Sequence, residues 1–171
     1  QFTHTTHLAQ MMLGDVNRNQ WISHFDQSME GQNPWLRNYI AFTGLLGSIR
    51  PEIIYLEAMY DDNQTPLLGN QDYILRGTPP DSRYWSFVIY DFNNRRIEPY
   101  QKTIASFHRI KLNENEQYEI IITDDLNKYP DQQAISHDGN DFNIVMRIYG
   151  PKASYYKNKN SLPVGSILPL N

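Results

Sequence analysis

The stretch RYWSFVIYDF, residues 83–92, is the part of the chain that decides the expected fold. Successive side chains of a strand point to opposite sides of a sheet, so alternate residues of this stretch share a face. One face would be wholly apolar and directed at a core; it holds Trp85, Phe87 and Ile89. The other face would mix polar and apolar groups, namely Tyr84, Ser86, Val88 and Tyr90. The stretch therefore predicts a long strand with one buried face and one semi-polar face.

The same period of two recurs on both sides of this stretch. The segments between the periodic runs carry the Asp, Asn, Pro and Gly residues that are typical of turns. Short strands separated by such turns indicate a mainly β protein, an antiparallel β-sandwich of jelly-roll-like type. Residues 126–141 are expected to form a long polar loop. Strands are predicted over residues 53–60, 71–77, 84–92, 118–125 and 142–150, with one or two short strands within 97–113.

The N-terminal part of the chain has a different pattern. Residues 1–33 are polar and weakly patterned, and predict one or two short helices or an arm that orders only against another surface. Residues 34–48 predict a clear helix, because Pro34 suits a first helical turn. We therefore expect an N-terminal arm over 1–33 and a single β-sandwich domain over 34–171 that begins with this helix. Within the arm, helical spacing is carried by Leu8, Met11 and Met12, and by Trp21, Ile22 and Phe25.

Length and composition describe an ordinary globular chain of 171 residues, 40% hydrophobic and 20% charged. A domain of this size buries about 70% of its unfolded surface and needs no metal or disulfide to fold. The net charge is −4 and no basic run occurs, so nucleic acid is not an expected partner. There are no cysteines, which excludes thiolate metal sites, a cysteine nucleophile and disulfides.

Two features of the sequence bear on the location of the protein: the lack of a long apolar run and the identity of the first residue. No apolar run approaches the ~18 residues that a membrane-spanning helix needs. The chain begins at Gln1 rather than at a methionine. We expect a processed N-terminus and a periplasmic, cell-surface or extracellular location; a chain trimmed before a domain is the alternative.

Several stretches of the chain resemble a bacterial family, the domain-of-unknown-function family 1214. In the family's order and spacing they are NPWLRNYIAFTGLLGSIRPEIIYLEA, GNQDYILRG, RYWSFVIYDF, NIVMRIYGPKASYY and a final LP, over residues 33–163. The resemblance implies a jelly-roll-like β-sandwich of the single-domain exported type. In other members of the family, this domain is the C-terminal half of a protein whose N-terminal half belongs to the domain-of-unknown-function family 1254. It supplies no established reaction.

The chain departs from that family's pattern at three places. Tyr84 stands where the first of two tryptophans is usual, and Glu98 stands before Pro99 where asparagine is usual. The segment SHDGNDF replaces an asparagine-tryptophan pair before the last long strand. A pocket lined by a missing tryptophan would be altered here.

The semi-polar face of the opening stretch is the best candidate for a ligand site. The strand over 142–150 divides in the same way and would carry Arg147 and Tyr149 on its mixed face. Arginine offers a planar fork of donors and tyrosine a flat ring with a polar tip, which suit a ligand with hydroxyl groups or a carboxylate. In the alternative, Arg147 pairs with a carboxylate across the sheet and the tyrosines cap the core. The candidate ligand-binding residues are Tyr84, Ser86, Tyr90, Arg147 and Tyr149.

Histidines and paired aspartates are the other candidates for chemistry. His137 stands beside Asp138 and near Asp141, a set that could act as a general base or bind a hard cation. The Asp-Gly pair there is also typical of a turn, so we expect no metal, no cofactor and no assigned catalytic residue. His108 is expected on a strand surface. Two acidic pairs are expected to end strands rather than to bind calcium: Asp61 with Asp62, and Asp124 with Asp125.

Three classes of function stay open on the sequence. The first is an exported binding module for a small molecule or glycan, favoured by the mixed face and by the lack of hydrolase, P-loop and dinucleotide motifs. The second is an assembly subunit of a cell-surface or filamentous structure, self-associating through residues 1–33. The third is an enzyme with acid–base chemistry from His108 or His137. We rank the binding module first, and the balance of motifs leans away from an enzyme.

Overall fold

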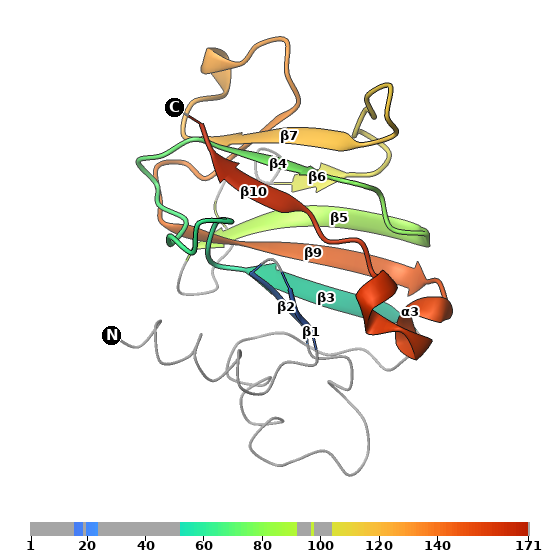
Figure 1. Cartoon of the computed structure of the whole chain (residues 1–171). Helices are drawn as coiled ribbons and strands as arrows, with labels where there is room; N and C mark the ends of the chain where they lie inside the picture. The colour runs from blue at the N-terminus through green and yellow to red at the C-terminus, as the bar shows by residue number, and fades with distance from the viewer. Residues whose placement is uncertain (1–15, 19, 24–51, 92–96, 98–103, 171) are drawn as a thin grey trace.

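The computed structural model describes residues 16–18, 20–23, 52–91, 97 and 104–170. Within them the chain is mainly β, with two sheets and short helical segments (Figure 1). The helical segments are η2 (Leu126–Lys128), α3 (Ser154–Lys157) and η3 (Lys159–Ser161). The strands are β1 (Val16–Arg18), β2 (Trp21–Ser23), β3 (Ile53–Ala58), β4 (Tyr73–Gly77), β5 (Ser82–Asp91), β6 (Ile104–Ser106), β7 (Tyr118–Thr123), β8 (Ala134–Ser136), β9 (Phe142–Pro151) and β10 (Ser166–Pro169).

The larger sheet is built around the two longest described strands. Its order is β1-β2-β3-β9-β5-β6, and every neighbouring pair is antiparallel. β5 and β9 pair along their whole length, from Ser82 opposite Pro151 to Asp91 opposite Phe142. The strands predicted over 84–92 and 142–150 are confirmed within the described residues as β5 and β9, and they are direct neighbours.

The smaller sheet has the order β10-β4-β7-β8 and is mixed. Its pairs are antiparallel except for β7 and β8, which run parallel. Parallel neighbours need a crossover rather than a tight turn, and residues 124–133, which contain η2, supply it. The expectation of antiparallel pairing throughout is therefore wrong at this edge of the sheet. The expectation of a loop over all of residues 126–141 is also wrong, because η2 and β8 lie within that range.

One core lies between the two sheets. Phe87 and Trp85 of β5 meet Tyr118 of β7, with ring centroids 5.2 Å and 5.3 Å apart. Each large apolar side chain that leaves water here contributes about 1.5–3 kcal/mol. Trp85, Phe87 and Ile89 are all buried in this core, as their alternation predicts. From the smaller sheet the core takes Tyr73, Leu75, Tyr118, Ile120, Ile122, Ile135 and Ile167.

The N-terminal residues that the structure describes are strands, not helix. β1 and β2 form a hairpin, and Ile22 of β2 lies opposite Glu57 of β3. The helical expectation for Trp21 and Ile22 is therefore wrong. Their spacing fits a helix, but pairing with β3 and burial in the core decide the conformation of so short a segment. The expected helix over 34–48 and the remainder of the arm lie outside the described residues.

The C-terminal tail returns to the smaller sheet. After β9 the chain forms α3 and η3 and then enters β10, which lies along β4 (Figure 1). Ile167 of β10 is opposite Leu75 and is buried in the core. None of the helices in the described ranges has the length and apolar character required to cross a membrane.

Candidate functional site

The surface of the six-stranded sheet that faces away from the core is called the outer face here. Opposite residues of an antiparallel pair share a face, so the register places Tyr84 beside Tyr149 and Ser86 beside Arg147 on it. Tyr90 lies further along the same face, opposite Asn143. The structure thus places all five candidate residues on this face, where Ser86 is buried and the other four are half-exposed, namely Tyr84, Tyr90, Arg147 and Tyr149.

Strand β3 adds residues to this face that sequence reasoning missed. Tyr55 is opposite Arg147, and Glu57 is opposite Val145. The period of two in residues 53–60 already puts Tyr55 and Glu57 on one side of a strand. What the sequence lacked was the order of the strands, because nothing local shows that β3 lies next to β9.

Arg147 is held by an aromatic partner. Its guanidinium donates a hydrogen bond to the hydroxyl of Tyr90, and the guanidinium carbon lies 5.8 Å from the centre of the Tyr90 ring. The pair of opposite residues Val88 and Val145 lies between Arg147 and Tyr90 along the two strands. The Arg147 side chain therefore reaches along the sheet over these valines. Within the described part of the chain it pairs with this phenol and not with a carboxylate.

Half-exposed rings surround Arg147 and continue toward β6. Tyr84 meets Tyr149 edge to face, with ring centroids 5.5 Å apart, and meets Phe107 at 5.4 Å. The ring of His108, an exposed residue, lies 5.8 Å from the Tyr84 ring. Burial raises the pKa of Tyr55, and Tyr149 adds to the rise. The Tyr55 phenol is therefore neutral at physiological pH, and the tyrosines of this face present flat apolar rings with polar tips.

A polar contact lies deeper on the same face. Asn143 donates from its side-chain amide to the Glu57 carboxylate, and both residues are buried. A buried carboxylate must be hydrogen-bonded, because leaving it unpaired costs several kcal/mol. This hydrogen bond joins β9 to β3 through two buried side chains on the outer face.

The set around His137 does not assemble as a base or a cation site. His137 is fully buried and stacks on Phe142 with ring centroids 5.0 Å apart. Asp141 accepts the backbone N–H of Gly69 at 2.9 Å, and Asp138 sits in the turn with a φ of 51°. Among the residues that the structure describes, no group of three or more acidic or histidine side chains could hold a metal ion.

Of the four paired aspartates, three accept backbone N–H groups and Asp124 forms an ion pair. Asp61 accepts the N–H groups of Asn63 and Thr65 at 2.9 Å and 2.8 Å. Asp62 accepts the N–H of Ile167 at 2.9 Å. Asp124 forms an ion pair of 2.6 Å with Lys128, one turn further along the chain. These contacts fit the expected structural role of the aspartates.

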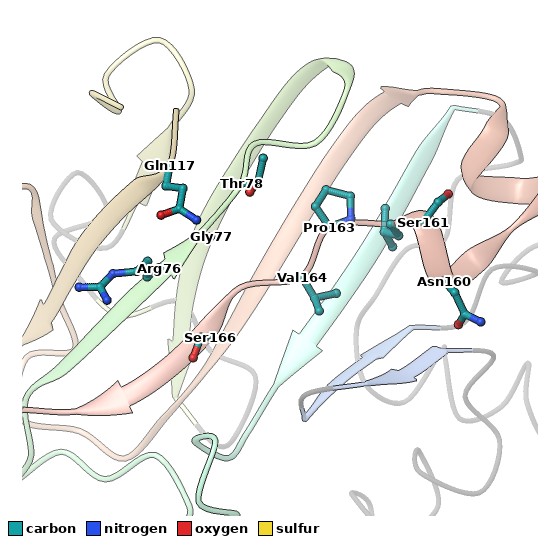
Figure 2. A pocket seen from close by; sticks show the side chains of 10 residues that line it. Arg76, Gly77, Thr78, Gln117, Asn160, Ser161, Pro163, Val164 and Ser166 are labelled. Atoms are coloured by element: carbon teal, nitrogen blue, oxygen red, sulfur yellow. The ribbon is translucent and has the colours of Figure 1, made fainter. Parts of the chain in front are cut away.

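A second candidate site is an open pocket on the four-stranded sheet, with a volume of about 580 Å³. It lies where β4 ends and β10 begins (Figure 2). Sequence reasoning did not find it, because its residues come from distant segments and form no local motif. Its lining residues are Arg76, Gly77, Thr78, Gln117, Asn160, Ser161, Leu162, Pro163, Val164 and Ser166.

A family model matches the part of the chain that contains strands β3 to β9. The model is that of DUF1214, a protein family of unknown function, and it matches residues 52–153. The chain belongs to the DUF1214 family. The matched residues of this DUF1214 protein include β3, β5 and β9, which carry the outer face. The resemblance inferred from the sequence is thereby confirmed at the level of the family.

Solved structures show that the DUF1214 fold recurs in longer chains. The VPA0106 protein from Vibrio parahaemolyticus matches with a TM-score of 0.68 and 18% identity, over 99% of this chain and 42% of that one. An uncharacterized protein from Burkholderia cenocepacia matches with a TM-score of 0.53 and 14% identity, over 73% of this chain and 31% of that one. At such identities the likeness concerns the fold alone. A comparison with curated proteins found no match.

Proposed function

We propose that this DUF1214 protein is a binding module that holds a small molecule or a short glycan on the outer face. The observation that carries the proposal is the gathering of half-exposed Tyr55, Tyr84, Tyr149 and Arg147 on one side of a rigid sheet. Tyrosine and arginine are the residues that most often anchor bound partners, since they combine apolar area with polar tips.

The geometry suits a ligand that has both a flat or apolar surface and an acceptor oxygen. The rings of Tyr84 and Tyr149 offer faces and edges for the apolar part. Arginine has five N–H donors in a fixed fork, and the contact with Tyr90 holds the guanidinium of Arg147 in place before a ligand arrives. Such preorganisation lowers the entropy cost of binding. Arg147 would then donate to a ligand hydroxyl or carboxylate.

The proposal includes a jelly-roll type of β-sandwich and an exported location. Two sheets that share one core support the first. A chain without cysteines is compatible with the second, because an oxidising compartment then threatens no free thiol.

The first test is native mass spectrometry of the protein purified from its own source, which reports any retained small molecule, followed by affinity measurements with that molecule. Arg147→Gln should weaken binding about tenfold or more, because a hydrogen bond from a charged donor contributes about 1.5–3 kcal/mol. Arg109→Gln is the matched control, since Arg109 is an exposed arginine on the turn after β6 and is not among the candidate ligand-binding residues. Unchanged affinity in both Arg147→Gln and Tyr149→Ala would rule the outer face out.

The two alternative functions have less support. His108 is exposed and His137 is buried, and within the described residues neither hydrogen-bonds to a carboxylate that could orient it for acid–base catalysis. For the assembly alternative, residues 16–18 and 21–23 of the supposed arm are strands of this chain's own sheet. Self-association through the rest of residues 1–33 stays a prediction, and the oligomeric mass from the same spectrum tests it.

A further inference from the structure

The positive charge of Arg147 has no carboxylate in contact with it among the described residues. Its guanidinium donates to the hydroxyl of Tyr90, and its Nε donor is buried without a hydrogen bond. Arginine stays protonated in proteins, so Arg147 cannot lose this charge as a buried lysine can. A half-exposed guanidinium with donors to spare is suited to binding an anion. The ion pairs within the described residues involve other side chains, namely Arg76, Arg83, Lys128 and Lys152.

The surroundings of this charge are apolar. Val88 and Val145 lie beneath the Arg147 side chain and are only 1% and 3% exposed. The half-exposed rings of Tyr84 and Tyr149 stand beside them on the same face. Opposite charges attract each other more strongly next to such low-dielectric groups than they do in water. The surface therefore fits a ligand in which a negative charge is joined to a flat apolar body.

The outer face offers one positive charge. Among the side chains that β3, β5 and β9 direct to this face, the charged ones are Arg147 and Glu57. Glu57 lies opposite Val145 and is 6% exposed, with the amide of Asn143 donating to it. A ligand with two negative charges would be repelled by Glu57 and would have no second cation to bind it. This favours a monoanion, and so a carboxylate over a phosphate monoester.

We propose, on the basis of the binding function proposed above for the outer face, that the ligand class is a planar aromatic monocarboxylate such as benzoate or cinnamate. The carboxylate accepts N–H groups of the Arg147 guanidinium, whose planar fork matches its two oxygens. The aromatic body of the ligand lies against the rings of Tyr84 and Tyr149. A neutral sugar hydroxyl would leave the charge of Arg147 uncompensated.

The experiment is a titration of the whole chain with benzoate and trans-cinnamate, and with benzamide and cinnamamide as neutral molecules of the same shape. Backbone amide shifts in NMR spectra report both the place and the affinity of binding. At least one carboxylate should shift the signals of Tyr84, Arg147 and Tyr149. It should bind about tenfold or more tightly than its amide, the difference expected for hydrogen bonds between charged groups. Phenyl phosphate should bind more weakly than benzoate.

Variants separate the charge of Arg147 from its packing. Arg147→Gln should weaken the carboxylate about tenfold or more and change the amide by less than about twofold, because only the carboxylate loses a charged partner. A merely structural effect of the substitution would weaken both ligands equally. Arg147→Lys keeps the charge without the planar fork and should give an intermediate affinity. Arg109→Gln, at an exposed arginine, should leave both affinities unchanged.

The outcomes distinguish this ligand class from the binding function on which it rests. Equal affinity for acid and amide, with both weakened by Tyr149→Ala, would overturn the carboxylate and still support binding at the outer face. Three other results would also overturn the proposal: no shift at the outer face with either carboxylate, an unchanged ratio of acid to amide affinity in Arg147→Gln, or tighter binding of phenyl phosphate than of benzoate. In each case the retained molecule in the native mass spectrum still tests the binding function by itself.

Discussion

At the scale of single residues, His137 shows how a fold selects one protonation state. Its Nδ1 accepts the backbone N–H of Gly139 at 3.1 Å, so the ring holds its proton on Nε2. A second proton could only go to Nδ1, where it would face a donor and break that bond. Burial lowers the pKa of His137, and the nearby Asp124 opposes this only in part. The neutral ring therefore stabilises the turn before β9.

The first prediction at this scale concerns pH. Because the folded pKa of His137 lies below its unfolded value of about 6.5, the unfolded chain binds the proton first as pH falls. The stabilisation is complete above about pH 6.5 and is lost below it, by up to ~1.4 kcal/mol per pH unit, until the folded pKa is reached. Urea denaturation between neutral and mildly acidic pH measures this slope.

Two substitutions separate His137 from the other histidines in that experiment. His137→Asn keeps a side-chain acceptor for the N–H of Gly139 but does not titrate, so it should flatten the slope by one proton. His108→Asn, at an exposed histidine, should leave the slope as it is. A slope that survives in His137→Asn and disappears in His108→Asn would contradict the assignment.

At the scale of elements, the last strand is held by a side chain as well as by its neighbour. β10 pairs with β4 on one side, and on the other Asp62 accepts the N–H of Ile167 at 2.9 Å and bonds to the hydroxyl of Ser166. The backbone N–H of Asp62 also donates to the carbonyl of Ile167 at 2.8 Å. Asp62 further accepts the amide of Gln20, next to β2. One carboxylate thus caps an edge strand and ties it to the N-terminal hairpin.

Asp62→Ala is expected to lower the free energy of unfolding by about 2–3 kcal/mol, since hydrogen bonds to a charged acceptor contribute about 1.5–3 kcal/mol each and part of the loss is recovered by water. The amide of Ile167 should exchange with solvent much faster, while that of Ile120 in β7 should not. Asn63→Ala, at the exposed neighbour, is the control and should stay within ~0.5 kcal/mol of the parent. Unchanged exchange at Ile167 would show that pairing with β4 alone holds β10.

The length of an element decided whether the sequence could predict it. β5 and β9 alternate over enough residues for their faces to be read directly, and Trp85 and Arg147 fall where alternation puts them. β2 and β8 have three residues each, too few for a period to show, and their conformations depend on distant partners. For the same reason the sequence predicts only part of the outer face. The residues of β5 and β9 follow from the alternation of these long strands, whereas Tyr55 is placed beside them only by the order of the strands in the sheet.

At the scale of the whole molecule, Trp21 joins parts of the chain that are far apart in sequence. It is 0% exposed, its ring lies 6.1 Å from that of Phe87, and its indole N–H donates to the carbonyl of Gly165 at 2.6 Å. One residue of the N-terminal hairpin therefore contacts the larger sheet and the segment that leads into β10. This makes the hairpin part of the core rather than an attachment to it.

Trp21→Ala is expected to cost about 3–5 kcal/mol of unfolding free energy, the range for removing a buried aromatic side chain. Trp21→Phe keeps most of the buried area and should lose about 1–2 kcal/mol, because the carbonyl of Gly165 then lacks its partner. Leu112→Ala, at an exposed leucine, should change stability by less than ~0.5 kcal/mol. Urea denaturation with unchanged m values would attribute these differences to the native state. If Trp21→Ala behaved like Leu112→Ala, the hairpin would be peripheral to folding, and residues 1–33 would again be free to serve a neighbouring subunit.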